Sequence, residues 1–163
     1  MIFYRPIFVT RQALRITAVR RLLADAGVTA ELQTVHPEHL ERIVTAEADW
    51  LVIVDGQAMP QADMFERMRR RSPGSRIVIW TDALTTNLLL ATIEWGLNGL
   101  LSSTLPPQEA AHALLRICRG ERLLRFDAES GEKKPPGSSR VAAAAAFDAQ
   151  WMLHGAEPHG RET

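Results

Sequence analysis

The chain of 163 residues lacks several features that would assign it to a particular class of protein. It has one cysteine, Cys118, so no internal disulfide can form. No apolar stretch approaches the roughly 20 residues that a membrane-spanning helix needs, and no basic start followed by a long apolar core opens the chain. We therefore expect a cytoplasmic protein that does not enter a membrane.

An excess of charge of one sign is also missing, because 19 basic residues balance 19 acidic ones. Proteins that bind nucleic acid in a general way concentrate a basic excess on one face, so we expect no direct nucleic-acid contact. The run from Arg67 to Arg71 is a local exception and is interpreted as a solvated helix face. With 46% apolar and 23% charged residues, the composition is typical of one globular domain with an appendage.

Short apolar runs alternate with longer amphipathic stretches along the first three quarters of the chain. The apolar runs predict strands at 6–10, 28–35, 50–54, 76–80 and 99–102. The amphipathic stretches predict helices at 11–27, 37–48, 61–71, 85–96 and 106–120. This alternation is typical of an α/β fold, a doubly wound five-stranded parallel sheet with helices on both faces.

The composition changes from about residue 127. We expect a folded domain at 1–126, a flexible linker at 127–139 that is rich in proline, glycine and serine, and a tail at 140–163. The alanine-rich part of the tail predicts a helix at 140–154. A free helix of this length is marginal in water, so we expect it to dock on its own domain, a second copy or another protein.

The polar residues with the clearest positions follow the predicted strands. Asp55 comes directly after the apolar run WLVIV, and Thr10 and Thr81 follow two other strands. In parallel sheets, ligands collect beyond the carboxyl ends of the strands. An isolated buried charge is expensive unless it lies at a solvent-facing strand end, so Asp55 is either a turn-forming residue or part of a site.

Other polar residues give weaker signals. His36 and His39 lack a third ligand at a diagnostic spacing, so no metal site is predicted there. Cys118 is expected to be a small core residue. His112 lies on another helical face and is therefore not its base.

Residues 6 to about 124 resemble a CheY-like receiver domain of the response regulators, with the texture of the NarL/FixJ branch. Three stretches carry the resemblance: VIVDGQAMP, SPGSRIVIWTDA and GLNGLLSSTLPPQEAAHALLRICRGE. The resemblance implies that Asp55 holds the phosphoacceptor position and Thr81 the switch hydroxyl. It also implies signalling in a two-component phosphorelay.

The chain departs from the receiver pattern at several positions. Thr10 and Arg11 occupy the positions of the acidic pair that helps to hold Mg²⁺, and Ser103 replaces the lysine that contacts the phosphoryl group. Leu100 replaces the conformational aromatic of the fifth strand, and Arg11 is expected to bring a cation near Asp55. A hard cation needs several oxygen ligands, so these changes predict a degenerate receiver.

We therefore expect a pseudo-receiver that is not an enzyme, holds no cofactor and acts through contacts with a protein. The partner is a histidine kinase, another regulator or a second copy in a homodimer. Receivers commonly bind through the first and fifth helices, or through the fourth helix, fifth strand and fifth helix. Trp95, Phe147 and Trp151 are the candidate anchors.

Two other functions are weighed against this one. In the first, Asp55 is a working phosphoacceptor, and a Mg²⁺ site is rebuilt with residues such as Asp82 or Glu47. In the second, the chain is a flavodoxin-like enzyme, but a glycine-rich phosphate loop is absent where TRQAL follows the first strand. The residues after Gly120 also lack the length and pattern of a helix-turn-helix domain.

Overall fold

The computed structural model describes residues 4–125. The predicted linker at 127–139 and tail at 140–163, with Phe147 and Trp151, lie outside the described residues.

Six parallel strands form one sheet in the order β2-β1-β3-β4-β5-β6. The strands are β1 (Arg5–Val9), β2 (Gln33–Val35), β3 (Trp50–Asp55), β4 (Arg76–Thr81), β5 (Gly99–Ser102) and β6 (Leu123–Arg125). The helices are α1 (Ile16–Asp25), α2 (Leu40–Ile43), α3 (Ala62–Arg71), α4 (Thr86–Glu94) and α5 (Pro107–Cys118), with short 3₁₀ turns η1 (Ala13–Arg15) and η2 (Pro37–His39). The predicted α/β class and parallel sheet are confirmed.

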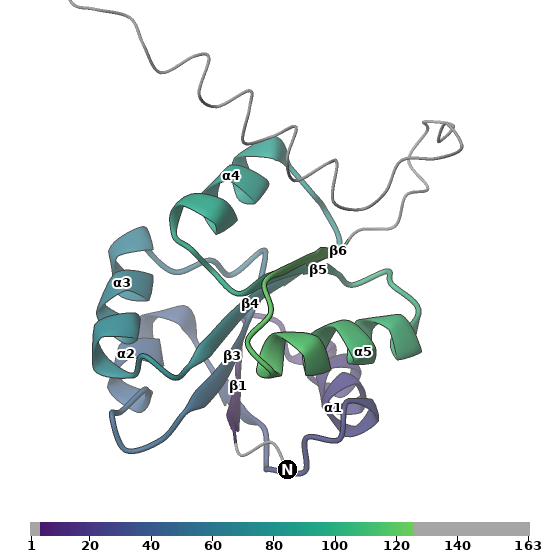
Figure 1. Cartoon of the computed structure of the whole chain (residues 1–163), viewed down its shortest axis with the longest axis horizontal. Helices are drawn as coiled ribbons and strands as arrows, with labels where there is room; N and C mark the ends of the chain where they lie inside the picture. The colour runs from purple at the N-terminus through teal and green to yellow at the C-terminus, as the bar shows by residue number, and fades with distance from the viewer. Residues whose placement is uncertain (1–3, 126–163) are drawn as a thin grey trace, which may run out of the picture. The chain divides into compact units, whose positions relative to one another are not determined.

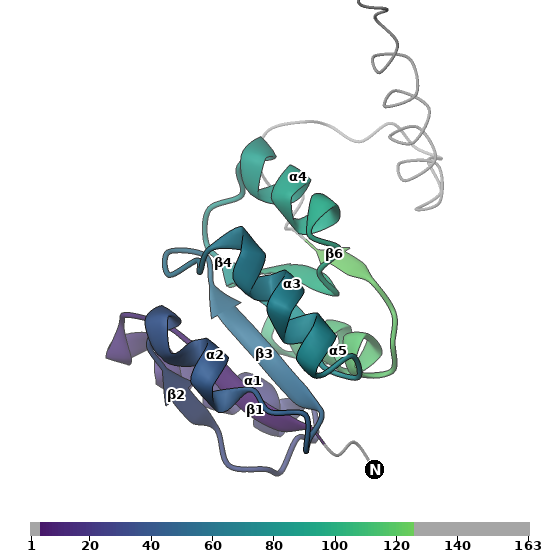
Figure 2. The same ribbon diagram turned by 90° about the vertical axis from the view of Figure 1, so that its left-hand side faces the viewer.

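Helices cover both faces of the sheet. Figures 1 and 2 show α1 and α5 on one face and α2, α3 and α4 on the other. The central strand β3 is buried along its whole length, and its side chains alternate between the two cores. Leu51 and Ile53 join the core under α1 and α5, whereas Val52 and Val54 join the core under the other three helices. This explains why the run WLVIV is continuously apolar.

Several observed elements differ from the predicted ones: β2 begins at Gln33 and not at residue 28, and larger differences concern β6 and α2. The sheet has a sixth strand, β6, because Gly120 takes a positive φ of 101° after α5 and the chain turns back along β5. The helix predicted at 37–48 ends at Ile43. The next residues are held by tertiary hydrogen bonds instead: the indole of Trp50 donates to the carbonyl of Thr45, and Ser72 donates to that of Ala48.

The sheet topology brings two strand ends together. The chain runs from β1 outward to the edge strand β2 and then returns to β3 on the other side of β1. The carboxyl ends of β1 and β3 therefore meet at the point where the strand order reverses, which is where open α/β sheets form their sites. Val9 pairs with Val54, so Thr10 and Asp55 emerge side by side. Among residues 4–125, no helix is long and apolar enough to cross a membrane.

Candidate functional site

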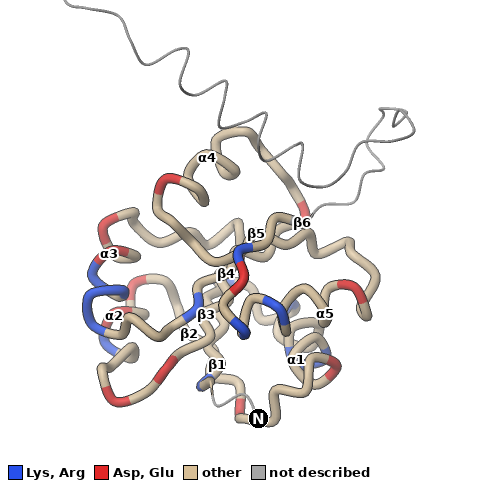
Figure 3. The backbone as a smooth tube through the Cα atoms, viewed as in Figure 1, with Lys and Arg blue, Asp and Glu red and all other residues tan. Residues whose placement is uncertain are grey.

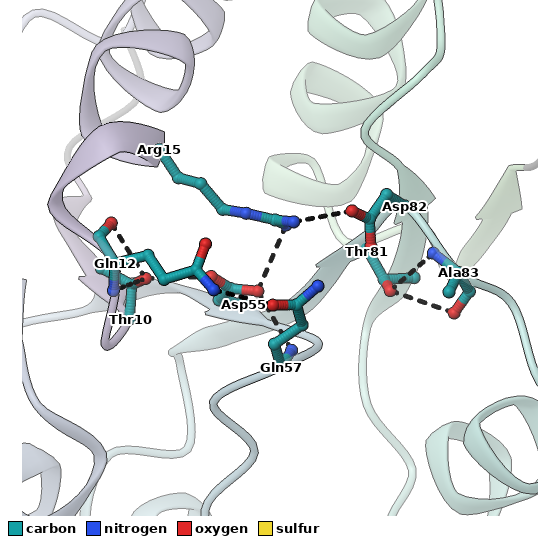
Figure 4. Close-up of polar contacts among 8 residues, drawn as sticks. All are labelled: Thr10, Gln12, Arg15, Asp55, Gln57, Thr81, Asp82 and Ala83. Carbon is teal, nitrogen blue, oxygen red and sulfur yellow. Dashed lines mark hydrogen bonds and ion pairs between the residues drawn. The ribbon is translucent and has the colours of Figure 1, made fainter.

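Asp55 is the last residue of β3, and it is 0% exposed. Its carboxylate therefore does not lie at a solvent-facing strand end. A buried carboxylate is tolerated only when it is paired and hydrogen-bonded, and this one is both. The hydroxyl of Thr10 donates to Oδ2 at 2.9 Å, and the backbone N–H of Gln57 donates to Oδ1 at 3.0 Å. Figure 4 shows these contacts.

The charge partner of Asp55 is Arg15, at the end of the 3₁₀ turn η1. Its Nη1 lies 3.3 Å from Asp55 Oδ1, and its Nη2 lies 2.7 Å from Asp82 Oδ2 (Figure 4). The side chain is 17% exposed and its guanidinium lies over the ring of Trp80, 5.9 Å from the centroid. One guanidinium thus bridges the end of β3 and the loop that follows β4.

Arg11 does not supply this cation, contrary to the sequence-based expectation. A continuous helix was predicted from residue 11, but Gln12 is extended, with φ of −122° and ψ of 107°, and η1 begins only at Ala13. Arg11 is exposed, and Arg15 instead reaches over Asp55. The sequence did carry a signal for Arg15. It lies four residues after Arg11, so either side chain could lie beside Asp55. Only the backbone between them decides which one does.

A second link closes over the same carboxylate. Gln12 Nε2 donates to Gln57 Oε1 at 2.8 Å, which joins the loop after β1 to the loop after β3 (Figure 4). We call Gln12, Arg15, Asp55, Gln57 and Asp82 the loop network. Sequence reasoning missed Gln12, Arg15 and Gln57 as members, because long polar side chains beside a strand end carry no pattern of their own.

The electrostatics of the loop network centre on Arg15. The hydrogen bond from Arg15 lowers the pKa of Asp82 below its usual value, and the positive charge of the guanidinium acts in the same direction. Asp82 remains 42% exposed, while the side chain of Asp55 is only 1% exposed. The contact between Arg15 and Asp55 is therefore shielded from solvent, whereas the contact between Arg15 and Asp82 is open to it.

The structure locates the other positions that the resemblance singles out. The hydroxyl of Thr81 donates to the carbonyl of Ala83 at 3.1 Å and accepts from its N–H at 3.2 Å, so it closes a local turn (Figure 4). The backbone N–H of Ser103 donates to the carbonyl of Thr81 at 2.7 Å. Leu100 is fully buried in the core under α3 and α4. A Cβ at Gly56 would lie 2.6 Å from the Thr81 hydroxyl, so the β3 and β4 ends approach closely.

The donor set around Asp55 does not fit a magnesium site. Mg²⁺ needs near-octahedral oxygen ligands, whereas Asp55 is the only buried carboxylate of residues 4–125 and a guanidinium already contacts it. Within residues 4–125, no group of three or more His, Cys, Asp or Glu side chains could hold a metal ion. Glu47 precedes β3, so it lies near the amino end of that strand, whereas Asp55 lies at its carboxyl end.

The weaker candidates have ordinary surroundings. Cys118 is buried against Tyr4 and the core of α1 and α5, and burial raises the pKa of its thiol to about 11. His112 is exposed on α5. The rings of His36 and His39 lie 6.2 Å apart. In the arginine run on α3, Arg67 pairs with Asp63 and Glu41, and Arg70 pairs with Glu66.

Trp95 directly follows α4 and is half-buried. Its ring stacks on Phe65 of α3, with centroids 5.4 Å apart and planes at 29°. Trp95, the candidate anchor for a partner, therefore packs partly against the core of its own domain.

Solved structures of receiver domains share this fold. A LuxR-family two-component response regulator from Aurantimonas is 19% identical with a TM-score of 0.65, over 90% of this chain and 97% of that one. A LuxR-family DNA-binding response regulator from Silicibacter pomeroyi is 21% identical with a TM-score of 0.59, over 77% and 99%. A CheY-like receiver domain protein from Methanospirillum hungatei is 14% identical with a TM-score of 0.58, over 72% and 94%.

No protein-family model and no curated protein matches the sequence. At these identities the solved structures establish the fold alone. The chain has the CheY-like fold of response-regulator receiver domains, as its sequence motifs predicted. What it does at the position of Asp55 is a separate question.

Proposed function

We propose that this chain is a degenerate receiver that acts in signal transduction by binding a protein, and that it does so without phosphorylation of Asp55. The observation that carries the proposal is the contact between the Asp55 carboxylate and the guanidinium of Arg15, at 3.3 Å in a buried setting. Phosphoryl transfer to a carboxylate needs a free oxygen and a cation that neutralises the phosphate oxygens. Here the carboxylate oxygens are already engaged.

The surroundings of Asp55 support the same reading. Thr10 has a hydroxyl where the receiver pattern has an acid, and that hydroxyl donates its hydrogen bond to Asp55 itself. Arg11 is exposed and Ser103 carries no charge. An incoming phosphoryl group would have to displace Arg15 and Gln57 from Asp55, and residues 4–125 offer no second buried carboxylate to bind a divalent metal.

The face of α4 is the best-supported binding surface. Leu90 and Ile93 are 39% and 43% exposed on the side of α4 away from the core, and Leu84 in the preceding loop is 46% exposed. Glu94 is the one charged residue of this helix (Figure 3). A helix that is apolar on both sides is usually covered on both sides, so α4 fits an apolar protein surface.

The alternative surface lies between α1 and α5 and is more polar. It is an open groove of about 720 Å³, whose lining includes Arg21, Asp25 and His112. Aromatic and apolar anchors dominate the energetics of protein interfaces, and this groove offers few of them. The proposed partner, a kinase, a regulator or a second copy, is therefore assigned to α4, with Trp95 at the end of that helix.

One observation favours the alternative function, a phosphoacceptor receiver. Asp82 shares its cation with Asp55, so withdrawal of Arg15 would leave two carboxylates near one point. Such a pair is the beginning of a metal site. In this alternative, a kinase or a small phosphodonor phosphorylates Asp55 after Arg15 has moved away.

The experiment that separates the two is phosphorylation with a small phosphodonor. The full chain is incubated with phosphoramidate and Mg²⁺ and then analysed by intact-protein mass spectrometry, with a receiver that has a complete acidic pair treated in parallel. We expect no added phosphoryl group on this chain. A gain of one phosphoryl group that disappears in Asp55→Asn would overturn the proposal.

A further inference from the structure

The loop network ties together three loops that are distant in the sequence. Arg15 and Gln12 come from the loop after β1, Asp55 and Gln57 from the end of β3 and its loop, and Asp82 from the loop after β4. Each connection is a direct contact between side chains. The three loops are therefore joined without any ligand.

We infer that the side chain of Arg15 is a tethered cationic ligand of Asp55 and Asp82, and that this ligand holds the β4–α4 loop, and with it the start of α4, in one conformation. The inference deepens the proposed function and rests on it, because a binding face on α4 serves a partner only if α4 has a defined position. Arg15 is in this sense a positioning residue.

The geometry supports a ligand role and not merely a surface ion pair. The guanidinium presents two nitrogens to two different carboxylates, at 3.3 Å and 2.7 Å, and its plane is supported by Trp80. A planar fork of this kind is specific to arginine, since a lysine ammonium is a point charge and cannot span both acids in the same way. The inner acid is buried, so loss of the cation leaves an unpaired charge.

The path from Asp82 to α4 is short. Asp82 lies within the turn that Thr81 and Ala83 close, and Thr85 then caps α4 by accepting from the N–H of Leu88 at 3.1 Å. Leu84, one of the exposed apolar residues, lies between these two contacts. The Arg15–Asp82 pair ties this loop to the segment after β1, so release of Asp82 is expected to loosen the turn and the cap together.

The test is native-state hydrogen exchange, measured by NMR on the full chain without a phosphodonor. The reporters are the amides of Ala83, Leu88 and Leu89, each of which donates a hydrogen bond within or just after the loop. Buried amides of β3 report global opening. Asp82→Asn leaves the buried pair intact, and Asp25→Asn is the matched control, because Asp25 pairs with Arg21 at 3.8 Å within a single helix.

We expect Asp82→Asn to speed exchange at the three reporters by roughly 1.5- to fivefold, the range for a partly exposed pair, with β3 unchanged. Arg15→Ala is expected to speed it at least about tenfold, because Asp55 also loses its partner. Arg15→Lys should recover only part of the protection. Millimolar ethylguanidinium should restore protection in Arg15→Ala and have no effect on Asp82→Asn, while ethylammonium should restore neither.

Reporter amides that exchange at the wild-type rate in both Asp82→Asn and Arg15→Ala would overturn the inference. So would an equal acceleration at β3 in Asp82→Asn, which would indicate general destabilisation, or a failure of ethylguanidinium to restore protection in Arg15→Ala. The result is independent of the phosphorylation experiment, because a phosphoryl group on Asp55 would contradict the proposed function while leaving the exchange rates of the unmodified chain as measured.

Discussion

The hydroxyl of Thr10 donates a 2.9 Å hydrogen bond to Asp55, a residue 45 positions further along the chain. The contact is buried where the carboxyl ends of β1 and β3 meet. The bond forms because β1 and β3 are parallel neighbours in register, so that the residues after Val9 and Val54 lie side by side. Thr10, which the resemblance aligns with an acidic-pair position, thus has a structural role that needs no metal. Loss of this hydrogen bond is expected to lower the free energy of unfolding.

Thr10→Val removes this donor and leaves one oxygen of a buried carboxylate unsatisfied. We expect the free energy of unfolding to fall by about 1 to 3 kcal/mol, the usual cost of such a loss. Urea denaturation followed by circular dichroism measures it. Thr10→Ser, which keeps the hydroxyl, should lose much less, and equal losses in the two variants would count against the hydrogen bond.

Acid is expected to weaken the contact between Arg15 and Asp82. The pKa of Asp82 is lowered in the folded state, first by its hydrogen bond from Arg15. The ion pair therefore contributes stability above the unfolded-state pKa of about 3.9 and loses it as the pH falls through the lower folded value. Between about pH 5 and 3, the wild type should lose more stability than Asp82→Asn, by less than about 1 kcal/mol since Asp82 is half-exposed. Parallel pH profiles of the two proteins would contradict this.

Cys118 should be unreactive in the folded protein. Burial raises its thiol pKa from 9.0 to about 11, so at pH 8 the thiolate fraction is about a hundredfold smaller than in the unfolded chain. Reaction with a chromogenic disulfide reagent is expected to be slow in buffer and fast in concentrated urea. Rapid labelling of the native protein would show that this side chain is accessible.

The stack of Trp95 on Phe65 is expected to stabilise the junction of α3 and α4. Trp95→Ala removes a half-buried ring and should cost about 2 to 3 kcal/mol, below the range for a fully buried one. Trp95→Phe, which keeps a ring in place, should cost much less. Thermal unfolding of the two variants decides this, and a neutral Trp95→Ala would mean that the ring is free to serve a partner instead.

Most of the fold could be predicted from the pattern of apolar residues. The buried strands β3 and β4 and helices α3 and α5 lie within a residue or two of their predicted limits, because burial on two faces or on one stripe leaves a clear periodicity. The three-residue strand β6 and the truncated α2 were not predicted. Short elements carry too few residues for a period, and tertiary hydrogen bonds decide where they end.

The site could be predicted only in outline. The sequence by itself determined that Asp55 stands at a strand end. Its resemblance to receiver domains implies that Thr10 and Arg11 take the acidic-pair positions and that Ser103 takes the place of a lysine. The place of Asp55 follows from the apolar run before it, and the other assignments follow from the resemblance. Together they predict a receiver fold with an altered site.

Only the tertiary structure decided which cation meets Asp55. Arg11 and Arg15 are both close in sequence to the end of β1, and the choice depends on an extended residue, Gln12, and a 3₁₀ turn before α1. It also decided that Asp82 shares that cation. Side-chain reach across three loops depends on backbone angles and on burial, and neither is written in the spacing of residues along one chain.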